Sequence, residues 1–254
     1  MPDVIVFLGP SLRESEAERI LPKEFCAGST GLSGSAGGAG NTSDNVAGAG
    51  ERIVTEYLPP IKRGDIAYVI EQKPRIVCII DGLFFQDSSV GHREILKVLN
   101  AGIEVYGASS MGALRACELD TFGMTGVGRV YEMYRDGVIE SDDEVALACD
   151  PFTNEAVSEA LVDIRANLDN CVYLGIITAD EAAELVRIAA AVYYPRRNFN
   201  SLIKDAASQR VISDATLKRL ADYRKNRFFS QKERDAREVL GVVKERIAEL
   251  KSRR

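Results

Sequence analysis

Histidine is almost absent from this sequence: its 254 residues include one histidine, His92, and no tryptophan. The five cysteines are scattered, odd in number and without a Cys-x-x-Cys pair. Zinc sites are usually built from clustered cysteine and histidine ligands, and disulfide frameworks from paired cysteines. We therefore expect reduced thiols, no metal site and no cofactor, and any catalytic imidazole must belong to His92.

Long apolar runs are also missing, and no stretch is long and apolar enough to span a bilayer. The N-terminal stretch MPDVIVFLGPSL has no basic leader, and its apolar run Val4–Leu8 is too short for the core of a signal peptide. We therefore expect a cytoplasmic protein without a membrane partner.

Acidic residues outnumber basic ones, and the formal net charge is −6. From Ser213 to the C-terminus, however, 13 lysines and arginines stand against 7 acidic residues, so residues 1–212 carry −12. An acidic body argues against nucleic acid as a partner. The basic C-terminal tail is either a docking surface for an acidic protein or a solvated helix face.

Large side chains are nearly missing between Ala27 and Gly50, where the sequence reads AGSTGLSGSAGGAGNTSDNVAGAG. Such a composition buries too little apolar surface to offset the entropy of ordering. It also lacks the Gly-Lys-Ser/Thr ending of a phosphate-binding loop. We expect a flexible insertion or linker at about residues 27–50.

Apolar runs at Val4–Leu8, Arg75–Ile80 and Ile103–Ala108 are each followed by a turn and a helical pattern. This alternation favours a parallel sheet covered by helices. The sequence therefore predicts an α/β fold: a mostly parallel sheet with flanking helices in the N-terminal half, then a mainly helical region.

The chain becomes almost entirely helical in pattern after Gly123. The hexapeptide GMTGVG, Gly123–Gly128, has its glycines in a different order from a dinucleotide-binding motif, and no apolar strand precedes it. We interpret it as a turn before a helix. The expected organisation is an α/β core of residues 1–122 and a helical region of residues 123–254.

Three loops follow the predicted strands, at Gly9–Leu12, Asp81–Gln86 and Gly107–Met111. In a parallel sheet, ligands bind where such loops enter helix N-termini, because free backbone N–H groups point outward there. If the loops converge, they form a pocket suited to an anion or an oxyanion. The expected binding residues are Gly9, Ser11, Gly82, Ser109, Met111 and Arg115.

The third loop contains two adjacent serines within VYGASSMGALRACEL. A strand, a serine, a helix and a glycine two residues after Ser110 resemble a nucleophile elbow, although Ala108 replaces its first glycine. The alternative is that Ser109 caps the helix and Gly112 lets the helix pack close to the sheet.

His92 lies near the start of the second predicted helix, and Asp81 ends the strand before it. A relay in which His92 takes the Ser110 proton and Asp81 orients the imidazole is chemically sensible. The expected catalytic residues are therefore Ser110, His92 and Asp81. The alternative is that His92 is a surface or partly buried residue without a catalytic role.

Several motifs together resemble the TfuA-like proteins, in the order found in that family: VFLGPSL, YLPPIKRGD, IIDGLF, HREIL, VYGASSMGALRACEL, FGMTGVG and YRDGVIESDDEVAL. They cover roughly residues 6–147 with one gap, the glycine-rich stretch. The last hundred residues add nothing to the resemblance.

The resemblance implies a partner of YcaO-type enzymes, which use ATP to activate backbone amides and form thioamides on ribosomal peptides or proteins. It implies that the protein supplies sulfur, by hydrolysing the C-terminal thiocarboxylate of a sulfur-carrier protein to sulfide, with the peptide substrate reached through YcaO. The alternative is a binding module that recruits or activates YcaO without chemistry of its own.

Overall fold

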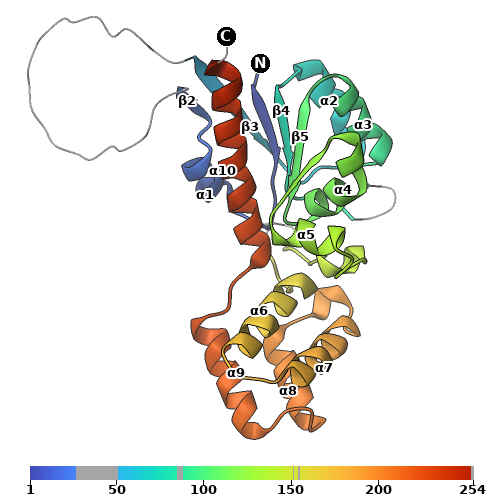
Figure 1. Ribbon diagram of the computed structural model, residues 1–254, viewed down its shortest axis with the longest axis vertical. Coiled ribbons are helices and arrows are strands. Elements are labelled where there is room, and N and C mark those ends of the chain that lie inside the picture. The colour runs from blue at the N-terminus through green and yellow to red at the C-terminus, as the bar shows by residue number, and fades with distance from the viewer. Residues whose placement is uncertain (27–50, 85–87, 151, 154, 253–254) are drawn as a thin grey trace, which may run out of the picture.

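The computed structural model describes residues 1–26, 51–84, 88–150, 152–153 and 155–252 (Figure 1). The expected flexible insertion at about 27–50 lies outside the described residues. Among the described helices, none combines the length and the apolar character needed to cross a membrane.

A mostly parallel sheet forms the N-terminal half, as predicted, and its strands follow the order β2-β3-β1-β4-β5-β6. All neighbours are parallel except β2, which pairs antiparallel with β3. In the centre, Val4 of β1 lies opposite Thr55 of β3 and Ile76 of β4. The strands are β1 Val4–Phe7, β2 Glu24–Cys26, β3 Arg52–Leu58, β4 Ile76–Ile79, β5 Glu104–Ala108 and β6 Thr125–Val127.

Helices cover both faces of the sheet, because the central strands are apolar on both sides. One face packs against α1 and α10, and the other against α2, α3 and α4 (Figure 1). The bounds of these helices and of α5 are α1 Glu14–Ile20, α2 Asp65–Gln72, α3 His92–Asn100, α4 Met111–Leu119, α5 Arg129–Arg135 and α10 Gln231–Ser252.

A separate apolar core lies in the helical region, where α6 to α9 pack on one another. The last helix, α10, leaves this group and returns to the sheet (Figure 1). The predicted fold class is confirmed. The four helices are α6 Leu161–Tyr173, α7 Ala179–Ala190, α8 Phe199–Ser208 and α9 Asp214–Asn226, and three short 3₁₀ turns lie at Asp120–Phe122, Asp142–Glu144 and Tyr194–Arg196.

Three of the described strands, β2, β3 and β6, differ from the sequence expectation. The interpretation of Gly123–Gly128 as a turn without a strand is wrong, because Thr125–Val127 forms β6 beside β5. Gly126 at the centre of β6 has little β propensity, and backbone pairing with Tyr106–Ala108 decides the conformation. Strands β2 and β3 were also missed, since they lie directly before and after the glycine-rich stretch.

The basic C-terminal stretch ends in α10, whose apolar side is buried against the sheet. The Arg246 guanidinium makes a two-pronged ion pair with Glu104 of β5, with Nη2 2.7 Å from Oε1. The Lys244 ammonium lies 5.9 Å from the centre of the Phe25 ring. These two basic side chains are therefore engaged within the fold.

Replacing Gly112 by alanine is expected to destabilise the fold. A Cβ atom at this position would lie 1.7 Å from the backbone oxygen of Ile79 on β4, so α4 would have to move off the sheet. Overpacking of this kind costs about 1–3 kcal/mol of unfolding free energy, and occasionally more. Denaturant unfolding measures the loss.

The matched control is Gly241→Ala in the middle of α10, where a Cβ atom meets nothing within 4 Å. Alanine is the better helix former, and this variant should gain about 0.5–1 kcal/mol. Equal stabilities of the two variants would contradict the close approach of α4 to the sheet.

Candidate functional site

Asp81 organises the carboxyl edge of the sheet. It follows β4, is 2% exposed, and turns its carboxylate toward the loop after β1. One oxygen accepts the backbone N–H groups of Gly9 at 2.9 Å and Ser11 at 3.1 Å, and the other accepts the Ser11 hydroxyl at 2.6 Å. The first two predicted loops therefore converge. The N–H groups of Gly9 and Ser11 serve Asp81, however, and are not free for a ligand.

Ser109 occupies the sharp turn between β5 and α4. Its φ of 68° lies in the left-handed region, and the N–H of Ser110 donates to the oxygen of Ala108 at 2.7 Å across it. Such a conformation is costly for a residue other than glycine and is found where the surroundings impose it. Ser109 is fully buried, and its hydroxyl has no hydrogen-bond partner among the described residues.

Neither serine caps helix α4 with its side chain. Ser110 occupies the N-cap position, where its side chain makes no capping hydrogen bond. The expected cap at Ser109 is therefore not made, whereas Gly112 does provide the close approach to the sheet described above. A serine held at a helix N-terminus without a capping bond is available for another purpose.

Ser110 and Asp81 line one cavity of about 370 Å³ together with Lys232 of α10. Gly82 and the segment Val145–Cys149 line the same cavity. The cavity thus lies where the carboxyl end of the sheet meets the segment leading to the helical region. Met111 begins α4 beside it, and the first N–H groups of a helix have no intrahelical acceptor.

Lys232 is the residue that the sequence analysis missed. It is 1% exposed, and its Nζ donates to the backbone oxygen of Val145 at 2.7 Å. Burial lowers the pKa of the Lys232 ammonium, and the negative charges of Asp81 and Asp163 oppose this shift. A larger share of neutral amine follows, and neutral amine can accept a proton.

Asp163 of α6 fixes the start of α10, where Lys232 lies. Its carboxylate accepts the backbone N–H groups of Gln231 at 2.7 Å and Lys232 at 3.0 Å, and the Ser230 hydroxyl at 3.0 Å. Burial raises the pKa of Asp163, against the lowering effect of Lys232 and these donors. The helical region therefore sets the position of the lysine over the sheet.

His92 does not join Asp81 and Ser110. Its Nε2 lies 2.7 Å from Oε2 of Glu118 on α4, and its side chain is 49% exposed. The Asp81 carboxylate is taken up by the Gly9–Ser11 loop, so the expected relay of Asp81, His92 and Ser110 is not assembled. The position of His92 at the first residue of α3 puts its ring on the surface beside α4.

Arg115 is likewise turned away from the Ser110 cavity. Its guanidinium donates to Glu118 at 2.5 Å, to the Ser89 hydroxyl at 2.9 Å and to the oxygen of Val90 at 3.1 Å. These bonds tie α4 to the segment before α3. We assign Arg115 this structural contact, in place of the ligand contact expected from the sequence.

Asp235, one turn after Lys232, anchors α10 to α5 and makes folding stability depend on pH. It accepts the Val130 N–H at 2.7 Å, and burial raises its pKa to about 6. The unfolded carboxyl ionises near its ordinary value of 3.8. The contribution of Asp235 to the free energy of unfolding is therefore fully present below about pH 4. It is lost as pH rises through about 6, and the loss amounts to about 3 kcal/mol.

Asp235→Asn should abolish this part of the pH dependence, because the amide does not ionise. Denaturant unfolding of both proteins at pH 4, 5, 6 and 7 measures the difference. If the unfolding free energies of the variant and the natural protein change with pH in parallel, Asp235 does not titrate in this range.

The comparisons with known proteins found a match to one family model. No curated protein matches the chain. The model of the family described as TfuA-like protein matches residues 81–198, a range that contains Asp81, both serines and Asp163. This match confirms the resemblance drawn from the sequence motifs and identifies this part of the chain as TfuA-like.

Proposed function

We propose that the protein supplies sulfide to a YcaO-type partner by hydrolysing an acyl thiocarboxylate in the Ser110 cavity. TfuA-like proteins are associated with YcaO partners in general, and the family match is consistent with such a role. The hydrolytic step rests on one observation: Ser110 and the buried Lys232 line the same cavity, and the Ser110 side chain makes no capping hydrogen bond.

In the first step, neutral Lys232 accepts the Ser110 proton while the serine oxygen attacks the thiocarboxylate carbon. The C–S bond breaks, an ester forms on Ser110, and the proton passes from Lys232 to the leaving sulfur, giving HS⁻. In the second step, water hydrolyses the ester to a carboxylate and a proton, and Ser110 is restored. The N–H of Met111 is the backbone donor at the helix N-terminus for the oxyanion.

Cys149 is the competing nucleophile, since it lines the same cavity. Burial raises the pKa of its thiol, with a smaller contribution from Asp81, and Lys232 only partly offsets this. The reactive form of cysteine is the thiolate, which a raised pKa disfavours. This favours the serine as the attacking group.

The test uses a synthetic peptide that ends in a thiocarboxylate, incubated with the purified protein without YcaO or ATP. We expect sulfide release above the rate in buffer and, on rapid quenching, a mass increase on the peptide that contains Ser110. A binding module would instead stimulate thioamide formation by YcaO with no sulfide release of its own. That outcome would rule out the proposed hydrolysis.

A further inference from the structure

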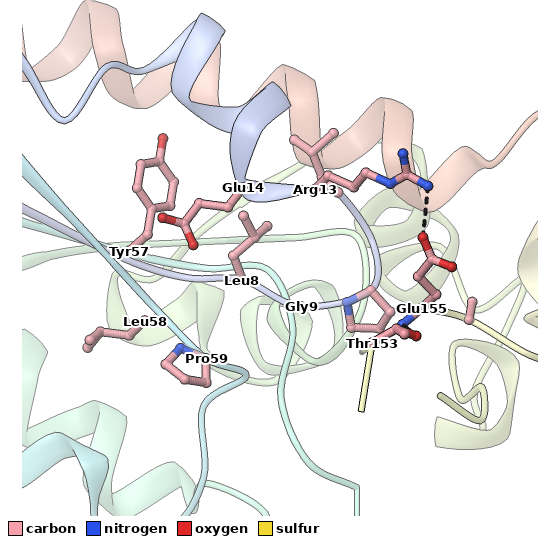
Figure 2. A pocket seen from close by; sticks show the side chains of 12 residues that line it. Leu8, Gly9, Arg13, Glu14, Tyr57, Leu58, Pro59, Thr153 and Glu155 are labelled. Atoms are coloured by element: carbon pink, nitrogen blue, oxygen red, sulfur yellow. Dashed lines mark hydrogen bonds and ion pairs between the residues drawn. The ribbon is translucent and has the colours of Figure 1, made fainter. Parts of the chain in front are cut away.

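A second, larger cavity is lined by the Gly9–Leu12 loop. It has a volume of about 680 Å³ and is formed at the carboxyl ends of β1 and β3 (Figure 2). This volume falls within the range of roughly 300–1,000 Å³ typical of ligand sites. Its apolar lining comes from Leu8, Leu12, Tyr57, Leu58 and Pro59.

The two cavities share one lining residue. Pro10 lines both of them. One chain segment also serves both, since Val145–Cys149 face the Ser110 cavity while Thr153, Glu155 and Ala156 face the larger one. Cys149 and Ala156 are joined by an antiparallel bridge that keeps the two parts of this segment together. The larger cavity therefore adjoins the reacting centre at Pro10.

The charges around the larger cavity are already paired. Arg13 Nη2 lies 3.0 Å from Oε1 of Glu155 (Figure 2). Glu14 is paired with Lys23 at 2.7 Å. A phosphate or nucleotide would find no unpaired cation among these residues, whereas an uncharged chain would meet apolar side chains and a neutral rim. The paired charges thus favour an uncharged ligand over an anion.

We propose that the larger cavity binds the uncharged polypeptide tail that carries the thiocarboxylate, with the acyl end reaching Ser110 past Pro10. This inference rests on the proposed function for the identity of the reacting group. The smaller cavity takes the reacting end, and the larger one takes the residues that precede it. Contacts remote from the reacting atoms then contribute to rate as well as to affinity.

The test compares two substrates of the same chemistry, thioacetate and an uncharged peptide thiocarboxylate. For the natural protein, kcat/KM for the peptide should exceed that for thioacetate. Ala156→Trp and Thr153→Trp each place a large ring at an exposed position of the lining. Each should lower the ratio of the two kcat/KM values by about 10-fold to 200-fold, the range for lost contacts in an apolar pocket.

The matched control is Ala101→Trp, an exposed residue that follows α3 at the opposite edge of the sheet. The ratio of kcat/KM for the peptide to kcat/KM for thioacetate in this variant should equal that of the natural protein. Equal kcat/KM values for the two substrates in the natural protein, or a ratio unchanged in Ala156→Trp, would overturn the proposal.

A binding measurement separates this proposal from the hydrolysis itself. A fluorescein-labelled peptide thiocarboxylate is titrated with the Ser110→Ala protein, and its anisotropy is recorded. Binding should weaken at least tenfold when Ala156→Trp is added. If neither substrate releases sulfide but this weakening is seen, the hydrolysis is wrong and the tail site stands; if the anisotropy curves coincide, the tail site is wrong.

Discussion

Ser110→Ala is expected to reduce sulfide release from the peptide thiocarboxylate by a factor on the order of 10⁴ or more, the usual cost of removing a nucleophile. The methyl group leaves the fold unchanged, because the Ser110 hydroxyl makes no hydrogen bond to another described residue and does not cap α4. Initial rates of sulfide formation, measured beside thermal unfolding and binding to YcaO, test this.

Ser109→Ala discriminates between the two serines. The Ser109 hydroxyl is fully buried and unpartnered, and Ser110 is the serine that lines the cavity. Removing the Ser109 hydroxyl should therefore lower the rate of sulfide release by less than about tenfold, a loss far smaller than that of Ser110→Ala. Full activity in Ser110→Ala, or a larger loss in Ser109→Ala, would refute Ser110 as the nucleophile.

Lys232→Met is expected to lower kcat/KM by about 10²–10⁴, the contribution of a positioned general base. Methionine has a similar length and keeps the buried stem, but it cannot take a proton. In the natural protein kcat/KM should rise with pH as Lys232 loses its proton, over a range below the ordinary lysine value because burial lowers this pKa. The carboxylates facing the amine are Asp81 and Asp163.

Lys232→Arg is the control that separates proton transfer from charge. A guanidinium keeps its proton at any accessible pH, so it preserves a positive charge without a base. Both variants should lose the rising limb of the pH profile, as measured with thioacetate and with the peptide. If Lys232→Arg keeps its activity and profile, Lys232 acts as a fixed charge and another group accepts the proton.

Much of the fold was readable from local patterns. The apolar runs that became β1, β4 and β5 are buried on both faces, and each precedes a helix, so their pattern predicted a parallel sheet. The strands at the sides were not readable in this way. β6 consists of Thr-Gly-Val, and its conformation depends on pairing with β5, a partner distant in sequence.

Asp81 and Ser110 were predicted as site residues because both directly follow apolar strands, and the carboxyl ends of parallel strands meet at one edge. Their roles depended on distances that a sequence does not contain. Asp81 holds the Gly9–Ser11 loop, and His92 binds Glu118. His92 was considered because it is the one imidazole in the sequence. Its chemical suitability as a base, however, does not determine where its side chain lies in the fold.

Lys232 carries one sequence signal, a charged residue in line with the apolar positions Ala236, Val239 and Val243 of its helix. That signal indicates that Lys232 is buried, but it does not identify the residues that surround it. The sequence by itself determined the family resemblance, the parallel α/β core and three of the cavity residues, Asp81, Gly82 and Ser110, because these follow from local composition and chain order. Only the tertiary structure decided that a helix from the far end of the chain brings Lys232 to Ser110, because that contact joins segments more than a hundred residues apart through the packing of α10 on the sheet and on α6.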